Sequence, residues 1–339
     1  MAKARKETET SAAATELTLV DAVGLAMARA MQEDETVILL GEDIGVDGGV
    51  FRATDGLIAR FGADRVRDTP LSEAIIGGLP VGLAAMGFRP VAEIQFMGFI
   101  YPVIDQIVNH AARLRTRTRG RLTCPMVLRA PYGGGIHAPE HHSESMEAMF
   151  AHIPGLRVVI PSSPARAYGL LLAAIRDPDP VIFLEPKRIY RATREAVADN
   201  GGALPLDRCF TVLKGADVTL VSWGAMLKET LDAAEVLAGD GVDAEVIDVA
   251  TLKPLDMDTI LASISKTGRC VIVHEAPLTG GFGAEIAARL AGEGLMHLVA
   301  PVERVAGWDT VMPLLRLEGR YMPSPERIVA AARRVLEYA

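Results

Sequence analysis

The sequence predicts an α/β protein of two domains, the first of which is built on a doubly wound parallel sheet. Its 339 residues, half of them hydrophobic, are enough for two cores at about 150 residues per domain. Short strands that are apolar throughout are separated by helical patterns, which is typical of a parallel sheet covered on both faces. A stretch rich in turn residues then separates this series from a second, shorter α/β series.

The first series begins with a helix over residues 18 to 32, in which the apolar side chains share one helical face. A further helix begins at Pro164, a favoured first helical residue, and Ser163 can cap it. We expect the other elements of this series to be helices over residues 72–86 and 103–115 and strands over residues 36–40, 91–96, 126–129, 157–160 and 181–185. Together these elements form a first domain over residues 17 to 192.

Residues 193 to 206 are rich in Gly, Asn, Asp and Pro, and we interpret them as the linker between the domains. The second domain, residues 207 to 339, repeats the α/β pattern on a smaller scale. Its strands are expected at residues 218–223, 244–247 and 270–274, and its last helix is expected at residues 324–338.

Charge and cysteine content narrow the class of function. The formal net charge of -8, from 43 acidic and 35 basic side chains, argues against nucleic acid as the partner. Three widely spaced cysteines in apolar surroundings favour a reducing cytoplasm over a disulfide framework or a zinc cluster. Residues 1 to 16 mix both charges without the apolar stretch of a signal peptide, and we expect a disordered tail. No apolar run reaches the ~18 residues that a membrane-spanning helix needs.

Glu73 follows Ser72, a good cap residue, in the first turn of an apolar helix. The simplest interpretation is a helix-start glutamate favoured by the helix dipole. The dipole favours the charged form by only ~0.3–1 kcal/mol, whereas full burial can raise the pKa of a carboxyl by up to ~3–5 pH units. If the apolar helix is buried, Glu73 would exchange protons near neutral pH. Gly77, Gly78 and Pro80 should loosen this helix, because an interior proline removes a hydrogen bond.

A group of polar residues follows the glycine run at residues 133–135, and a metal site is one interpretation of it. The group consists of His137, Glu140, His141, His142 and His152. Pro139 lies between the first two histidines, so they need not share a helical face. We favour one catalytic histidine, with the others as structural residues or polar lining of a pocket.

Two glycine motifs resemble cofactor-binding loops but lack part of the pattern. Gly239-Asp240-Gly241 resembles the start of a thiamine diphosphate phosphate-binding motif, yet no pair of asparagines follows it. The run at residues 280–283 opens a helix, but Ile286 stands where a dinucleotide fingerprint needs a small residue. Both are predicted to be turns. Five arginines between residues 113 and 121 predict a solvated face or a subunit contact.

Eight short segments occur in a specific order: Leu40-Gly41-Glu42-Asp43, Gly48-Gly49-Val50-Phe51, Asp68-Thr69-Pro70-Leu71-Ser72-Glu73, Glu93-Ile94-Gln95-Phe96, Asp105-Gln106-Ile107, His141-His142-Ser143-Glu144-Ser145, Pro154-Gly155-Leu156-Arg157-Val158-Val159 and Phe183-Leu184-Glu185-Pro186-Lys187. Together they resemble the β subunit of the decarboxylating component of 2-oxo acid dehydrogenase complexes. The resemblance extends from about residue 17 to the C-terminus. It implies a pyrimidine-binding α/β domain followed by a transketolase-type C-terminal domain, in agreement with the two predicted domains.

The resemblance implies thiamine diphosphate as cofactor. Glu73 matches the glutamate that bonds N1′ of the aminopyrimidine and favours the imino form, whose nitrogen deprotonates the thiazolium carbon. His142 matches the histidine that assists lipoyl reduction and acyl transfer. The cofactor's pyrimidine end would be lined by the residues that match Leu71, Gln95 and Phe99, with Glu42 on a hydrogen-bond path beside it.

The resemblance also implies ions and partners. The chain has no complete motif for Mg²⁺ and diphosphate, so an α subunit is expected to hold them in an α2β2 heterotetramer whose active sites lie between chains. The acyl group passes to a lipoyl arm of the acyltransferase core, whose small subunit-binding domain is expected to dock on the C-terminal domain. Some relatives hold potassium near the residues that match Met126, Val127, Ala174, Asp177 and Asp179.

Several alternatives remain at this point. A self-contained transketolase-like enzyme would need the phosphate motif in an additional upstream domain, for which 339 residues leave no room. A non-catalytic scaffold subunit would survive the loss of Glu73, and an acetoin dehydrogenase β subunit is a further alternative. The substrate stays open between pyruvate and branched-chain 2-oxo acids, because residues 93–96 and 185–188 resemble branched-chain enzymes and residues 133–140 resemble pyruvate enzymes of Gram-positive type.

Overall fold

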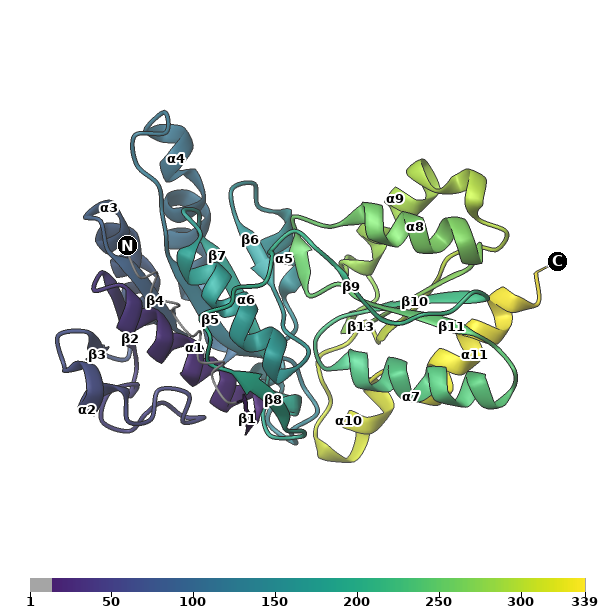
Figure 1. Cartoon of the computed structure of the whole chain (residues 1–339), viewed down its shortest axis with the longest axis horizontal. Coiled ribbons are helices and arrows are strands. Elements are labelled where there is room, and N and C mark those ends of the chain that lie inside the picture. Colours follow the sequence, from purple (N-terminus) through teal and green to yellow (C-terminus); the bar gives the residue numbers. More distant parts are fainter. Residues whose placement is uncertain (1–13, 339) are drawn as a thin grey trace, which may run out of the picture.

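The computed structural model describes residues 14 to 338, which form two α/β units side by side (Figure 1). The first unit contains a seven-stranded sheet and the second a five-stranded sheet. Apart from one edge strand in each sheet, all neighbouring strands are parallel. The predicted fold class is therefore confirmed. Within residues 14 to 338, no helix has the length and apolar character needed to cross a membrane.

The first sheet contains all five strands expected in that part of the sequence. Its middle strands are buried along their whole length, as a parallel sheet with both faces covered requires. Across the sheet the order is β12 (Thr251–Lys253), β6 (Arg157–Val159), β7 (Val181–Pro186), β5 (Val127–Tyr132), β4 (Arg89–Glu93), β2 (Val37–Gly41) and β3 (Val66–Asp68).

Helices cover both faces of this sheet. On one face, α1 (Leu19–Glu33) and α6 (Pro164–Arg176) pack against each other and the sheet. Thr18 caps α1 through a reciprocal capping box, and Ser163 caps α6 as predicted. The other face and the edge carry the remaining helices of this unit, α2 (Leu57–Phe61), α3 (Glu73–Ala85), α4 (Leu114–Arg117) and α5 (Glu147–His152).

The helix expected over residues 103 to 115 is not regular, so that prediction is wrong in detail. Short 3-10 turns flank a π-helical turn at Gln106–His110, and the only α-helical part is α4. This segment packs very closely onto α3, where a Cβ on Gly77 would lie 2.3 Å from Val103. Tertiary contact with α3, rather than local propensity, therefore determines how the segment winds.

Helix α3 also differs from its prediction, because it continues through Gly77, Gly78 and Pro80 without a break. Pro80 is buried within it. The two glycines allow the neighbouring segment to approach, so the packing contacts of α3 compensate for the hydrogen bond that proline removes.

The second unit has the order β14 (Glu303–Gly307), β13 (Cys270–Pro277), β10 (Val218–Ser222), β11 (Ala244–Asp248) and β9 (Phe210–Leu213). Helices α8 (Met257–Thr267) and α9 (Gly283–Glu293) cover the upper face in Figure 1. Helices α7 (Met226–Gly239) and α11 (Pro325–Leu336) cover the lower face, next to α10 (Leu315–Tyr321). Both predicted glycine turns are confirmed, since one joins α7 to β11 and the other joins β13 to α9.

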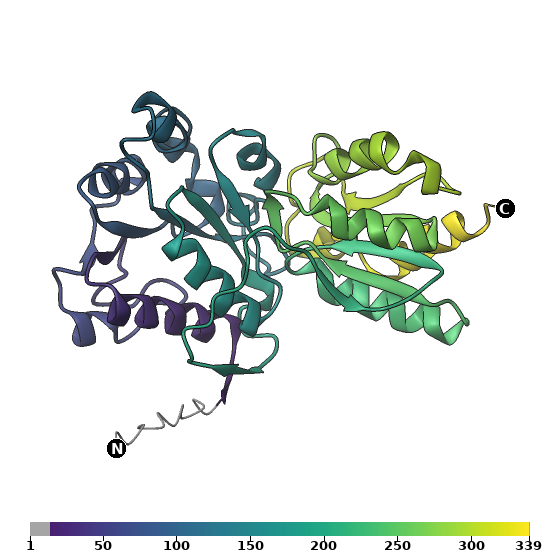
Figure 2. The ribbon, with the colours of Figure 1, turned by 45° about the horizontal axis from the view of Figure 1, so that its top comes forward.

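A small antiparallel pair, β1 (Ala14–Leu17) with β8 (Glu195–Ala198), corrects two predicted boundaries. Residues 14 to 16 were expected in the disordered tail and residues 195 to 198 in the linker. Each strand satisfies the backbone groups of the other, and β8 also packs against α6 (Figure 2). Neither strand carries a strong pattern of its own, because the pairing joins distant parts of the chain. Residues 1 to 13 of the expected tail lie outside the described residues.

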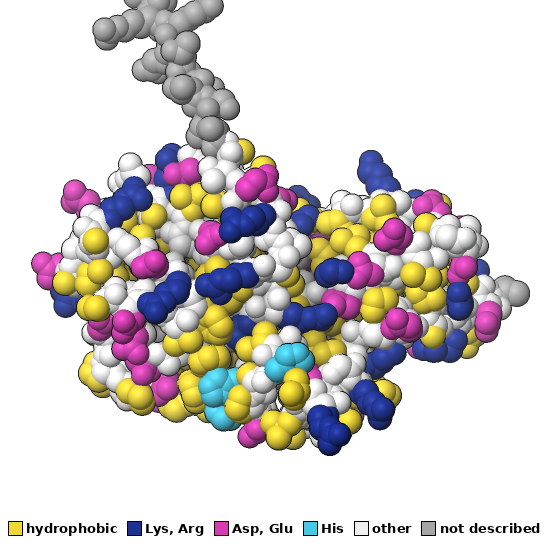
Figure 3. Space-filling model, turned by 90° about the horizontal axis from the view of Figure 1, so that it is seen from below, with side chains coloured by type: hydrophobic (Ala, Val, Ile, Leu, Met, Phe, Trp, Pro, Cys, Tyr) yellow, Lys and Arg dark blue, Asp and Glu magenta, His cyan; other side chains and the backbone are white. Residues whose placement is uncertain are grey.

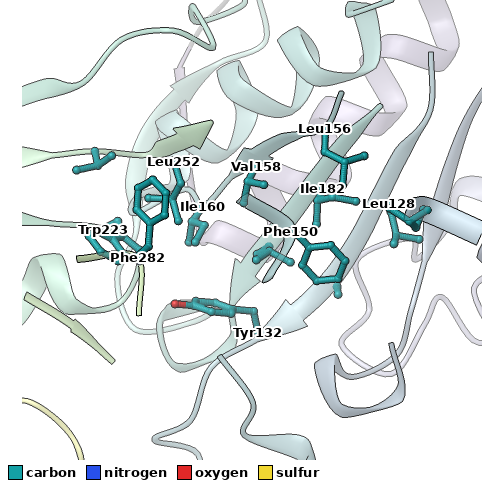
Figure 4. Close-up of a cluster of buried hydrophobic side chains, with 14 of the residues drawn as sticks. Leu128, Tyr132, Phe150, Leu156, Val158, Ile160, Ile182, Trp223, Leu252 and Phe282 are labelled. Carbon is teal, nitrogen blue, oxygen red and sulfur yellow. The ribbon is translucent and has the colours of Figure 1, made fainter. Parts of the chain in front are cut away.

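One of the three hydrophobic clusters extends across both units. Strand β12 belongs to the second half of the chain but pairs antiparallel with β6 at the edge of the first sheet. Figure 4 shows the resulting cluster, in which Tyr132 and Phe150 of the first unit lie near Trp223 and Phe282 of the second. The units are therefore held in a fixed relation by apolar burial as well as by their connecting segment.

Candidate active site

Two carboxyl groups meet at the carboxyl ends of neighbouring parallel strands. Glu42 follows β2, and Glu73 begins α3 shortly after β3. This end of a doubly wound sheet is the usual location of a ligand site. Ser72 occupies the cap position of α3 as predicted, although its side chain accepts no capping hydrogen bond. Glu73 is therefore free of a reciprocal cap and half-buried.

The charge of Glu73 acts on Glu42 at this end of the sheet. Burial raises the pKa of Glu42, and the negative charges of Asp43 and Glu73 raise it further. Like charges in a shared site favour retention of a proton by one of them. Glu42 and Glu73 thus stand at the carboxyl ends of neighbouring strands, where the charge of one raises the pKa of the other.

One face of the helix that carries Glu73 is exposed in this chain, which corrects the expectation that the helix is buried. Ile75 and Leu79 on α3 are 47% and 44% exposed, and Leu71 before the helix is 74% exposed. A run of apolar residues predicts that a helix is buried, but it does not show whether the same chain or a second chain covers the helix. Contiguous exposed apolar side chains of this kind mark an interaction surface. We call Leu71, Ile75 and Leu79 the α3 surface.

An aromatic group lies beside the carboxyl end of β4. Gln95 and Phe99, both predicted to line the site, are half-buried in the segment that follows this strand. The ring of His142 packs edge-on against Phe96 and Phe99, with ring centroids 4.1 and 5.3 Å apart. The structure therefore places His142 with Phe99, one of the predicted cofactor-lining residues.

The surroundings of His142 lower the pKa of its imidazole. Burial lowers its pKa, and the positive charges of His141 and Lys187 lower it further, while Glu140 opposes them. Its Nδ1 is buried and has no hydrogen-bond partner among the described residues. Burial and the two neighbouring positive charges therefore hold the pKa of His142 below the ordinary value for histidine.

Replacing His141 by Gln is expected to raise the pKa of His142, because the substitution removes a cation whose ring centroid lies 4.2 Å away. An NMR titration of the imidazole protons measures this change. His152→Gln, on α5, serves as the control and should leave the pKa of His142 unchanged. An unchanged or lower pKa of His142 in the His141 variant would contradict the assigned cause.

A loop over residues 133 to 145, here called the histidine loop, carries His142 and lies against the second unit. Its glycine run is required by close packing. A Cβ on Gly133 would lie 2.2 Å from Oε1 of Glu275, and Gly133 and Gly135 have φ angles of +83° and +80°. On the other side, a Cβ on Gly98 would lie 1.7 Å from the carbonyl oxygen of His141. The loop is held between the two units with little room to move.

The candidate metal ligands do not gather into one site. His137 pairs with Glu318, its Nδ1 lying 2.8 Å from the carboxylate, whereas His152 lies on α5. Figure 3 shows histidine side chains near the boundary between the units, bordered by hydrophobic side chains. Among residues 14 to 338, no group of three or more His, Cys, Asp or Glu side chains has an arrangement that could hold a metal ion.

The residues matched to a potassium site gather at the opposite end of the strands, near the amino ends of β5 and β7. Asp177 and Asp179 follow α6, and each carboxylate pairs with an arginine, Arg157 at 2.9 Å and Arg115 at 2.7 Å. Met126 contributes its carbonyl oxygen to a hydrogen bond from Val181 in the same region. The remaining matched residues, Val127 and Ala174, lie at the start of β5 and within α6. Only backbone carbonyls of this group would be suitable ligands.

A buried ion network beneath the site was missed from the sequence. Arg129 on β5 donates to Glu93 on β4 at 2.8 Å and to both oxygens of Glu185 on β7 at 2.6 and 2.9 Å. Tyr190 also donates to Glu185. These strands are neighbours, so the network joins the carboxyl ends of three strands. A charged residue inside each of three mostly apolar strands is the sequence pattern from which this network could have been predicted.

A second buried polar cluster lies where the units meet. Burial raises the pKa of Glu147 to about 7 and lowers the pKa of Lys187 to about 8. Trp223 donates to Glu147, and Lys187 donates to the carbonyl oxygen of Gly133. Glu147 and Lys187 lie within or beside motifs quoted for the family resemblance, but their burial depends on the second unit and could not be predicted locally.

Comparison with protein families and known structures agrees with this architecture. Residues 15–193 match the family model of the transketolase pyrimidine-binding domain, and residues 209–328 match that of the transketolase C-terminal domain. By structure, the chain is similar to a split-gene transketolase described as an inactive β4 tetramer, with a TM-score of 0.80 and 24% identity. That similarity covers 96% of this chain and 99% of the other, and it supports the fold alone.

Curated relatives give a closer similarity. The pyruvate dehydrogenase E1 component subunit β of Bacillus subtilis is 46% identical over 323 residues, which cover 95% of this chain and 99% of the relative. The protein of the same description from Acholeplasma laidlawii is 47% identical over 319 residues, covering 94% and 98%. The similarity therefore includes both units and nearly the full length of each relative.

Proposed function

Because the chain belongs to the family of pyruvate dehydrogenase E1 component β subunits, we propose that Glu73 is the carboxyl of its thiamine diphosphate site. The chain is the β subunit of a 2-oxo acid dehydrogenase and has its enzymatic role as part of the E1 component. The family depends on thiamine diphosphate. Neither an acetoin dehydrogenase subunit nor a scaffold is favoured by these relatives.

The residues at the carboxyl ends of β2, β3 and β4 fit the pyrimidine end of the cofactor. The observation that carries this proposal is the position of Glu42 and Glu73 at the carboxyl ends of the neighbouring parallel strands β2 and β3, where the charge of Glu73 also raises the pKa of Glu42. An apolar side chain and a ring, Leu71 and Phe99, suit the faces of the pyrimidine, and Gln95 offers polar groups. When bound, the cofactor supplies the carbon nucleophile and the electron sink for decarboxylation. Glu73 would hold and exchange the proton at N1′ of the aminopyrimidine.

His142 is proposed to act in acyl transfer to the lipoyl group. In that step the acyl carbon would bond one sulfur of the lipoyl disulfide as the S–S bond breaks. Its bond to the cofactor would then break, its hydroxyl would lose a proton to give the thioester carbonyl, and the second lipoyl sulfur would take up a proton. His142 lies at the aromatic group beside the cofactor-lining residues, and its lowered pKa makes its protonated form a stronger acid than ordinary histidine. It would give the proton to the departing sulfur.

An α subunit is proposed as the partner that holds the other end of the cofactor. Among residues 14 to 338, no group of three or more His, Cys, Asp or Glu side chains is arranged to hold a metal ion, and the sequence has no complete diphosphate-binding motif. We therefore assign Mg²⁺ and the diphosphate to the α subunit. The α3 surface supports this assignment, because three exposed apolar side chains directly beside Glu73 would be covered by a second chain. The proposed assembly is an α2β2 heterotetramer with active sites between chains.

The acyltransferase core is proposed to dock on the second unit through its small subunit-binding domain. An exposed apolar patch consists of Leu295, Met296 and Val299. Leu295 and Val299 also line a cavity of about 410 Å³ between α9 and residues 298–302, the segment before β14. A small domain needs such an apolar centre to bind at moderate area. Glu293 and Glu303 border the patch and offer charge to a basic partner.

The remaining assignments follow from the sequence and stay proposals. The domains that we propose are the predicted ones, residues 17–192 and 207–339 with a linker at residues 193–206, except that strands β1 and β8 add residues 14–16 and 195–198 to the first domain. Potassium is proposed to bind backbone carbonyls near Met126, Val127, Ala174, Asp177 and Asp179. Three free, buried cysteines support a reducing cytoplasm as the location, and they are Cys124, Cys209 and Cys270.

The proposed function is tested by co-expressing the chain with an α subunit and assaying pyruvate, 2-oxoisovalerate and 2-oxobutyrate. An artificial electron acceptor replaces the acyltransferase, so the assay reports decarboxylation alone. We expect an α2β2 particle that needs thiamine diphosphate and Mg²⁺ and turns over at least one of these acids, and the relative values of kcat/KM identify the preferred substrate. An assembled particle without activity on any 2-oxo acid would contradict the proposal.

A further inference from the structure

The histidine loop is held in place by two carboxylates of the second unit. Glu275 of β13 accepts hydrogen bonds from the backbone N–H of Gly134 at 3.0 Å and from the hydroxyl of Ser145 at 2.7 Å. It therefore joins the two ends of the loop. Inside the loop, the N–H of Gly133 also donates to the carbonyl oxygen of Glu144 at 2.9 Å.

Glu318 of α10 holds the middle of the loop. One carboxylate oxygen accepts from the N–H of Gly135 at 2.8 Å, and the other accepts from the N–H of His137 at 3.1 Å. Nδ1 of His137 lies 2.8 Å from the same carboxylate. Glu318 is only 2% exposed, so these three donors are what compensates the loss of water around its charge.

The geometry held by Glu318 is one that the loop would not adopt unaided. His137 has a φ of +61°, in the left-handed region that residues with a Cβ rarely occupy. Pro139 and a short 3-10 turn at Glu140–His142 then connect this point to His142. A change in the backbone at His137 is therefore transmitted to His142 through a short, constrained segment.

We propose that Glu318 is a positioning residue for His142. The second unit then does more than complete the core, because its buried carboxylate sets where the histidine stands beside Phe96 and Phe99. This inference rests on the proposed role of His142 in acyl transfer to the lipoyl group. It assigns no contact between Glu318 and any reacting atom.

The test uses the reconstituted heterotetramer and compares two steps. Decarboxylation is measured with an artificial electron acceptor, and acyl transfer is measured with a lipoylated domain. Because a misplacement of about 1 Å can cost about 10²-fold in rate, Glu318→Ala is expected to lower acyl transfer about 10²-fold and decarboxylation far less. Glu318→Gln keeps one acceptor oxygen and the same size, so it should fall between Glu318→Ala and the unsubstituted enzyme.

Matched controls separate positioning from folding and from the proposed function. Glu235→Ala removes an exposed carboxylate of the same unit, on α7, and both steps should keep their rates. Equal losses in both steps for Glu318→Gln, or no loss in either, would overturn the inference. If the Ala variant fails to assemble, the Gln variant decides by the same criterion. If His142→Ala retains acyl transfer, the proposed role of His142 fails; if it loses acyl transfer while both Glu318 variants keep it, only the positioning inference fails.

Discussion

Glu73→Gln is expected to lower turnover of the 2-oxo acid by about 10²–10⁴-fold in the reconstituted heterotetramer, the range that a positioned acid or base contributes. Glutamine keeps the size of the side chain and a hydrogen bond but cannot exchange the proton at the aminopyrimidine. Glu73 is half-buried, with no capping bond from Ser72, and its charge acts on Glu42. Helix α3 should form normally in the variant, since a first-turn carboxylate contributes only ~0.3–1 kcal/mol through the helix dipole.

Glu326→Gln is the matched control for Glu73. Glu326 also stands in the first turn of a helix that follows a serine, Ser324, but it is exposed and lies in the second unit. Its replacement should leave turnover unchanged. Decarboxylation by the Glu73 variant at the rate of the control would rule out the proposed role and return Glu73 to an ordinary helix-start residue.

Arg129→Leu is expected to give the largest loss of stability, about 3–5 kcal/mol in the free energy of unfolding of the first unit. The substitution leaves Glu93 and Glu185 buried without their cation, and these carboxylates are 5% and 0% exposed. The pKa of Glu93 is already raised, mainly by burial, so removing the guanidinium favours its protonated form still more. Urea denaturation followed by circular dichroism measures the loss.

Arg333→Leu provides the comparison for Arg129. Arg333 pairs with Asp240 at 2.6 Å, but both side chains are more than 40% exposed. Exposed pairs of this kind contribute about 0–1 kcal/mol, so the urea midpoint should hardly change. Equal stability of the Arg129 variant and the unsubstituted chain would show that the buried network is not what holds β4, β5 and β7 together at this end.

Local patterns predicted the inner strands of both sheets, but not the edge strands β3, β9, β12 and β14. The strands β2, β4, β5, β6 and β7 are mostly apolar because both faces of the sheet are covered, and this pattern is visible in the sequence. Capping residues fixed the start of α6 and α11, where Ser163 and Ser324 accept from the third helical N–H. The prediction of a regular helix over residues 103–115 was wrong, because the conformation of residues 101–117 depends on contact with α3.

Site residues could be predicted from the sequence only where they lie within a recognisable motif. Glu73 and His142 could be found because the residues around them form ordered motifs, whereas Glu275 and Glu318 act on a loop more than 120 residues away along the chain. Nothing in the local sequence of α10 marks Glu318 as different from a solvated helix residue. The exposure of Ile75 and Leu79 was likewise missed, because an apolar pattern predicts burial but not the chain that provides it.

The central claim is that this chain provides the pyrimidine end of a cofactor site whose diphosphate end another chain holds. Isothermal titration calorimetry with thiamine diphosphate and Mg²⁺ tests it directly, using the β chain alone, the α subunit alone and their equimolar mixture. The account predicts saturable binding by the mixture, with one site per αβ pair, and no tight binding by the β chain alone. Tight binding of the cofactor by the isolated β chain would contradict it.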